Sequence, residues 1–173
     1  MQSFNYQVPH NISMSTKIPI INEKGEYKYT LQKQPHKLLT KIVHELIRGG
    51  LPFCYKISDV KMQPFYSIDC QFTGIGYKLT EHLSQQTVSI MAHRVHLIEK
   101  AYSFTLNNHS YYFEKNATIT GHLKCDDQQI ATVSIPFDTN ISREFDMIIV
   151  NASTKEIAAL AAVLYQTFYY WNA

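Results

Sequence analysis

Four basic side chains between residues 37 and 48 have the spacing of one helical stripe. They follow one another at intervals of four, three and four residues: Lys37, Lys41, His44 and Arg48. Because a helix turns once in about 3.6 residues, this spacing places all four on one side. Cations in such a row bind the phosphate groups of a membrane interface. The stripe is therefore a candidate anion-binding site, and the alternative is the solvated face of a surface helix.

The cysteines and histidines do not have the spacing of metal ligands. Cys54, Cys70 and Cys125 are far apart and form no C-x-x-C pair, which indicates a reducing compartment and excludes a disulfide framework. His93 and His96 are three residues apart, so on a strand they lie on opposite faces. We expect no metal site and no cofactor.

Motifs for catalysis are missing as well. The sequence contains no G-x-S-x-G nucleophile turn and no glycine-rich phosphate loop. Acidic residues such as Asp69 and Glu114 stand alone in strand patterns, where a solvent-facing carboxylate is the usual outcome. We predict that the protein is not an enzyme and that it has no catalytic residues.

The charge distribution favours an anionic partner. Residues 1–61 contain nine Lys or Arg and four acidic residues, whereas the rest contains seven and ten. A basic end of this kind is typical of contact with phospholipid headgroups or nucleic acid. The basic part contains few arginines, which makes nucleic acid the weaker candidate, and a protein partner remains open.

The elements that must position these residues are mostly strands. Roughly a dozen stretches with a period of two residues follow one another at short spacing, which is typical of an antiparallel barrel or sandwich. One of them is a hairpin around "NEKG" in residues 18–31. An amphipathic helix near residues 36–48 interrupts the series and is stopped by Gly49-Gly50. No linker divides the chain, so residues 1–173 are predicted to form one domain.

The chain ends in a second helix that is apolar on every side. The S-x-x-E pattern of Ser153 and Glu156 predicts its start, and residues 157–165 contain no strongly polar side chain. A membrane span needs about 20 apolar residues, and Gln166 ends this run too early. We therefore predict a helix buried inside a closed barrel.

Three stretches of the sequence resemble the tubby C-terminal-like superfamily. They are "STKIPIINEKGEYKYTLQK", "YSFTLNNHSYYFEKN" and "EIAALAAVLYQTFYYW". The superfamily includes LURP-one-related proteins and phospholipid scramblases, and the chain looks most like its small single-domain bacterial members. The resemblance implies a mainly β (α+β) fold, a roughly twelve-stranded antiparallel barrel that encloses the C-terminal hydrophobic helix.

The resemblance also implies a function. Tubby domains bind phosphoinositides, so the expectation is a non-enzymatic barrel that binds anionic lipid or acts as an interaction scaffold. The alternative is an intracellular regulator that acts through nucleic acid or a protein partner. The expected location is the cytoplasm, with peripheral attachment to the inner membrane face. The calcium-loop pattern of the scramblases does not occur in "CDDQQ", so calcium is not expected.

Overall fold

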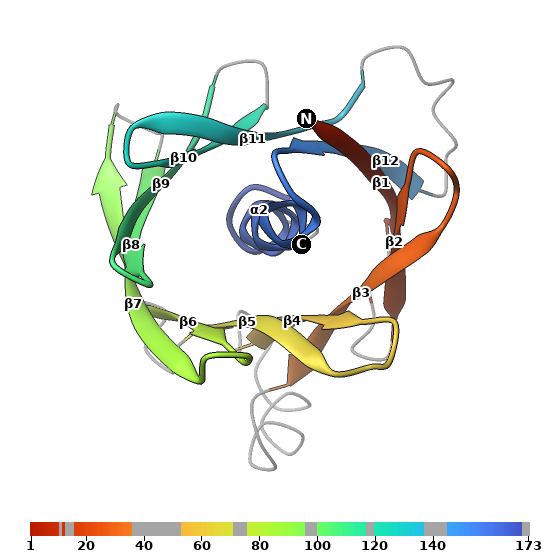
Figure 1. The fold of residues 1–173 in the computed structure, drawn as a ribbon, viewed down its shortest axis with the longest axis horizontal. Coiled ribbons are helices and arrows are strands. Elements are labelled where there is room, and N and C mark those ends of the chain that lie inside the picture. Colours follow the sequence, from red (N-terminus) through yellow and green to blue (C-terminus); the bar gives the residue numbers. More distant parts are fainter. Residues whose placement is uncertain are drawn as a thin grey trace.

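Twelve antiparallel strands form a closed ring in the computed structural model (Figure 1). The structure describes residues 1–10, 12, 16–35, 53–70, 76–95, 100–116, 120–136 and 145–170. Each strand pairs with the next one along the chain, and β1 pairs with β12 to close the ring. The strands are β1 (Gln2–Pro9), β2 (Lys17–Asn22), β3 (Tyr27–Pro35), β4 (Phe53–Asp59), β5 (Pro64–Cys70), β6 (Tyr77–Glu81), β7 (Gln86–Arg94), β8 (Lys100–Leu106), β9 (His109–Lys115), β10 (Gly121–Cys125), β11 (Gln128–Ser134) and β12 (Phe145–Ala152).

Short turns connect the strands at one end of the barrel, which we call the turn rim. The turns Asn107–Asn108 and Asp126–Asp127 each have two residues with positive φ, between 47° and 65°. Asn and Asp tolerate this conformation, which matches the twist of a two-residue hairpin. The opposite end, where β3 ends at Pro35, is called the far rim.

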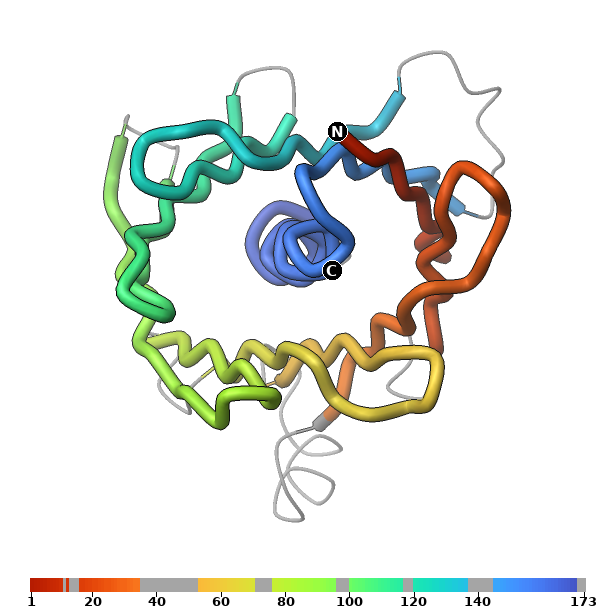
Figure 2. The backbone as a smooth tube through the Cα atoms, in the orientation of Figure 1, coloured from red at the N-terminus to blue at the C-terminus, as the bar shows by residue number. Residues whose placement is uncertain are grey.

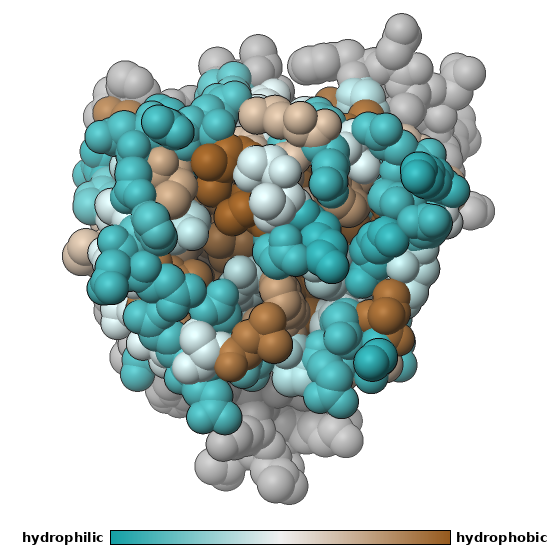
Figure 3. All heavy atoms as spheres, viewed as in Figure 1, coloured by the Kyte–Doolittle hydropathy of each residue, from teal (hydrophilic) through white to brown (hydrophobic). Residues whose placement is uncertain are grey.

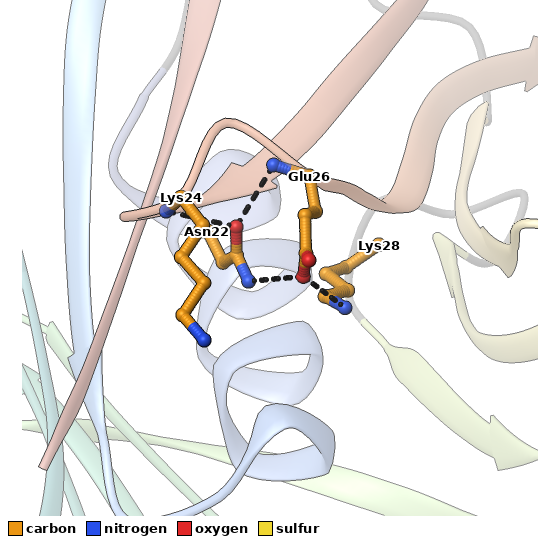
Figure 4. A network of polar contacts seen from close by, with 4 residues as sticks. All are labelled: Asn22, Lys24, Glu26 and Lys28. Atoms are coloured by element: carbon orange, nitrogen blue, oxygen red, sulfur yellow. Dashed lines mark hydrogen bonds and ion pairs between the residues drawn. The ribbon is translucent and has the colours of Figure 1, made fainter.

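The predicted "NEKG" hairpin is confirmed as the turn between β2 and β3 (Figure 4). The Asn22 Oδ1 atom accepts hydrogen bonds from the backbone N–H groups of Lys24 and Glu26, at 3.1 and 2.9 Å. Gly25 supplies the positive φ of +74°. The Glu26 carboxylate then accepts from Asn22 Nδ2 and pairs with Lys28, at 2.9 and 2.8 Å. The turn therefore satisfies its own polar groups.

Helix α2 (Lys155–Phe168) runs through the middle of the ring (Figure 2). It contacts β4 and β5 on one side and β11 and β12 on the other. Its N-cap is Thr154, whose hydroxyl accepts a hydrogen bond from Ile157 N at 3.3 Å. The predicted start at Ser153 is therefore wrong by one residue. Thr154 lies three residues before Ile157, whose backbone N–H has no partner within the helix, and the Thr154 hydroxyl accepts its hydrogen bond.

The core lies between α2 and the inward faces of the strands. Leu160 and Leu164 are 0% exposed, and the four alanines of the helix keep it narrow enough to fit: Ala158, Ala159, Ala161 and Ala162. Gln166 and Thr167 are buried too, and the Thr167 hydroxyl donates to the Val163 carbonyl at 2.7 Å. The predicted helix inside a barrel is confirmed.

Polar residues cover most of the edge of the face that Figure 3 shows, and hydrophobic residues are visible toward its middle. This is the hydropathy pattern of a barrel whose interior, rather than its outer wall, contains the apolar side chains. No helix among the described residues has the length and apolar character needed to cross a membrane.

Candidate anion-binding site

Three basic residues lie in one row across neighbouring strands at the far rim. Arg94 ends β7 and pairs directly with Lys100, the first residue of β8. The register of β8 with β9 pairs Tyr102 with Phe113, and continuing this register by two residues would place Lys100 opposite Lys115. Residues that face each other in a sheet point to the same side and are about 5 Å apart. We call these three residues, Arg94, Lys100 and Lys115, the basic row.

The row is on the inward face of the sheet, where the end of α2 meets the barrel. Tyr102 and Phe113 are on the same face and are buried, whereas Arg94 and Lys100 are exposed. The wall therefore continues beyond the packed core and opens to solvent there.

Aromatic side chains at the end of α2 lie beside the row. The Tyr169 hydroxyl donates to the Lys100 carbonyl at 2.6 Å, and the Lys115 Nζ atom is 5.5 Å from the centroid of the Tyr169 ring. Phe168 stacks on Tyr102 with centroids 3.7 Å apart. The C-terminal end of a helix also carries partial negative charge, which favours cations nearby. Tyr169 therefore holds the backbone of Lys100 and lies against the charged group of Lys115.

The charges of the basic row are not neutralised within the described part of the chain. Arg94, Lys100 and Lys115 form no ion pair with a described carboxylate. Like charges directly opposite each other destabilise a sheet, so an anion between them would remove a repulsion as well as form new bonds. Arginine binds phosphate through two parallel hydrogen bonds, and lysine contributes a compact charge.

One described acidic residue on the inward face of the far rim is already engaged. Asp146, the second residue of β12, accepts a hydrogen bond from the Tyr170 hydroxyl. Its other oxygen is 3.5 Å from His10 Nε2. These contacts tie the carboxylate to β1 and to the end of α2, and it forms no ion pair with the basic row.

Lys33 adds a cation to the inward face of β3 at the same rim. It is partly buried, its Nζ atom lies 5.0 Å from the centroid of the Phe53 ring, and it pairs across the ladder with Tyr55. Burial lowers the pKa of Lys33, and no acidic neighbour opposes this shift. An anion at this position would stabilise its charged form.

The two rims differ in charge. Among the described residues, six basic and three acidic ones lie within two positions of the strand ends at the far rim: Lys17, Lys33, Lys78, Arg94, Lys100 and Lys115, with Asp69, Glu114 and Asp146. The turn rim, counted with its turns and the start of α2, has five and seven: Lys24, Lys28, Lys61, Lys124 and Lys155, with Glu23, Glu26, Asp59, Glu81, Asp126, Asp127 and Glu156. Positive charge therefore predominates over negative charge among the described residues of the far rim.

The predicted stripe of Lys37, Lys41, His44 and Arg48, with its helix near residues 36–48, lies outside the described residues and stays a prediction. The sequence reasoning missed the basic row because its three members are six and fifteen residues apart. The available signal was weak: each is the first or last residue of a strand, and only the register brings them together.

Comparison with known proteins gives one match. The family model described as "Tubby C-terminal like domain" matches residues 4–171. No curated protein and no solved structure matches the chain.

Proposed function

The chain belongs to the Tubby C-terminal like domain family, and on this premise we propose that it binds the phosphorylated headgroup of an anionic phospholipid at the far rim. Members of this family are generally barrels without enzymatic activity, and tubby-like domains in general bind phosphoinositides. The proposed function therefore requires the protein to recognise the charge and shape of the headgroup.

One observation carries the proposal: Arg94, Lys100 and Lys115 stand at neighbouring strand ends of the far rim, and none of the three forms an ion pair with a carboxylate of the residues that the structure describes. A phosphate that carries two charges can accept hydrogen bonds from two or three such groups at once. Tyr169 beside the row provides an amphipathic ring of the kind that lies at the headgroup level of a membrane.

The stripe of Lys37, Lys41, His44 and Arg48 is proposed as a second part of the same surface. Strand β3 ends at Pro35 on the far rim, and Lys37 follows two residues later in the sequence. Two basic groups of residues at one end would give peripheral attachment to the inner membrane face of the cytoplasm.

The experiment is co-sedimentation with vesicles of neutral phosphatidylcholine, with and without phosphatidylserine or a phosphoinositide. Binding should require the anionic lipid and weaken with salt. Replacing Arg94, Lys100 and Lys115 with Gln should lower the partition coefficient about fivefold for each charge removed, since a basic residue near an anionic surface contributes about 1 kcal/mol. The matched control replaces Lys24, Lys61 and Lys155 at the turn rim and should bind as the unchanged protein does.

A second set of variants separates the two parts of the surface. Lys37→Gln with Lys41→Gln tests the stripe alone. Equal losses in the turn-rim control and the basic-row variant would contradict the proposal, as would binding that ignores lipid charge. If the protein bound an anionic oligonucleotide more tightly than vesicles of equal charge, the result would favour the alternative, an intracellular regulator that acts through nucleic acid.

A further inference from the structure

Three potential metal ligands meet at the turn rim, on the opposite end from the basic row. They are His109 Nδ1, Cys125 Sγ and a carboxylate oxygen of Asp126, and all lie within 4.8 Å of one another. His109 starts β9, whereas Cys125 ends β10 and Asp126 follows it in the turn. Strand pairing brings them together across 16 residues of sequence.

The distances are close to those of a tetrahedral face. The His109 Nδ1 atom is 2.6 Å from Asp126 Oδ2, and Cys125 Sγ is 3.8 Å from the same oxygen. Zinc bound at about 2.0–2.3 Å in tetrahedral geometry has ligand atoms about 3.3–3.6 Å apart. The distance between Nδ1 and the carboxylate oxygen would have to lengthen by about 0.7 Å, which a side-chain rotation supplies.

Neighbouring groups hold two of the three ligands in orientation. The other carboxylate oxygen of Asp126 accepts a hydrogen bond from Ser110 N at 2.9 Å, and Asp126 N donates to the Ser110 carbonyl at 2.9 Å. The Tyr111 hydroxyl hydrogen-bonds the Cys125 sulfur, and this contact favours the thiolate. Outer contacts of this kind are typical of metal centres and raise affinity.

From this geometry we propose that His109, Cys125 and Asp126 form a zinc site with three protein ligands. A thiolate, an imidazole and a carboxylate together suit Zn²⁺, which accepts sulfur, nitrogen and oxygen, better than Mg²⁺ or Ca²⁺, which prefer oxygen alone. Three protein ligands leave the fourth position for water or another exogenous ligand. The site binds metal at an exposed rim, so its zinc exchanges with the surroundings.

Binding requires one proton to leave. The Cys125 thiol must ionise, whereas the hydrogen on His109 Nδ1 that is shared with Asp126 moves to Nε2 by a change of tautomer. Burial raises the pKa of Cys125. Zinc affinity should therefore fall as the pH is lowered, because protons compete with the metal for the Cys125 thiolate.

The test titrates Zn²⁺ into the full chain, in a non-chelating buffer with a phosphine reductant, against a chromophoric chelator. We expect one zinc ion per chain. Cys125→Ser and His109→Ala should each weaken binding by tenfold or more, and Tyr111→Phe by about tenfold through the loss of the outer contact. Cys54→Ser and His93→Ala are the matched controls and should bind normally.

A second readout identifies the ligand atoms. Cobalt replaces zinc in such sites, and a cysteine thiolate gives it an intense near-ultraviolet absorption band. This band should be present in the unchanged protein and in Cys54→Ser, and absent in Cys125→Ser. A chain that binds no zinc at pH 7.5, or one whose Cys125→Ser variant keeps both affinity and band, would overturn the proposal. A far-ultraviolet circular dichroism spectrum shows whether each variant is folded.

Discussion

Gly121 begins β10 at a point where two aromatic rings leave no room for a side chain. A Cβ atom there would lie 2.9 Å from Phe113 Cζ and 3.0 Å from Tyr165 Cδ2. Both rings are fully buried, so neither can turn out to solvent. The close packing of the barrel wall against α2 therefore requires glycine at this position.

We expect Gly121→Ala to lower the free energy of unfolding by about 1–3 kcal/mol, the usual cost of forcing a methyl group into a filled core. A urea titration followed by circular dichroism measures this change. Adding Phe113→Leu should recover part of the loss, because the two substitutions share one contact. Gly25→Ala is the control for steric contact: its Cβ would meet nothing within 4 Å, and only its φ of +74° adds strain. The packing argument would be contradicted if Gly121→Ala and Gly25→Ala lowered the free energy of unfolding equally and Phe113→Leu left the effect of Gly121→Ala unchanged.

At the residue scale the sequence was a partial guide. The predicted N-cap of α2, Ser153, is one residue before the observed N-cap, Thr154. Both residue types are good N-caps, so the sequence pattern alone cannot decide which of the two caps the helix. Neither Arg94 with Lys100 nor His109 with Cys125 could be paired in advance. Such pairs depend on register, and a shift of one residue moves every side chain to the other face.

Helix α2 is stable because of its surroundings. Ten consecutive residues, 158–167, are buried, and the helix touches the wall on opposite sides. A helix of 14 residues is marginal by itself in water. Burial of its apolar side chains inside the barrel therefore supplies most of the free energy that keeps it helical.

Leu160→Asp should abolish cooperative folding, because it places an unpaired carboxylate in a site that is 0% exposed. Leu160→Ala removes only apolar volume and should cost about 2–5 kcal/mol. Thermal melting by circular dichroism distinguishes the two outcomes. Lys155→Asp, in the exposed first turn of the same helix, is the control and should melt as the unchanged protein does. A Leu160→Asp protein that melts cooperatively would contradict the enclosed helix.

The type of most described elements could be predicted because their hydrophobic period was clear, although β1 was not singled out. Strand β12 and the "NEKG" hairpin follow the period-two pattern, and residues 157–165 are apolar throughout, as only an enclosed helix can be. The closure of the sheet was expected from the family resemblance and from the helix it must cover. The expected closure is confirmed by the pairing of β1 with β12, a pairing that no local pattern could show.

The whole barrel depends on the pairing of its first and last strands. Strand β1 forms eight residue pairs with β12, from Gln2 opposite Ala152 to Pro9 opposite Phe145, but only two with β2. It also contributes three fully or nearly buried side chains to the core, Phe4, Tyr6 and Val8. Closure removes the exposed strand edges that lead other sheets to aggregate.

Removal of residues 1–10 should open the barrel along β12 and expose the side of α2 that β1 covers. We expect the shortened chain to self-associate in size-exclusion chromatography with light scattering, and to lose its cooperative melt. A synthetic peptide of residues 1–10 should restore a monomer, since the free edge of β12 offers the complete ladder. The same peptide with Phe4→Asp and Tyr6→Asp should fail, because backbone pairing alone does not fill the core. A shortened chain that stays monomeric and melts at an unchanged temperature would show that closure through β1 is dispensable.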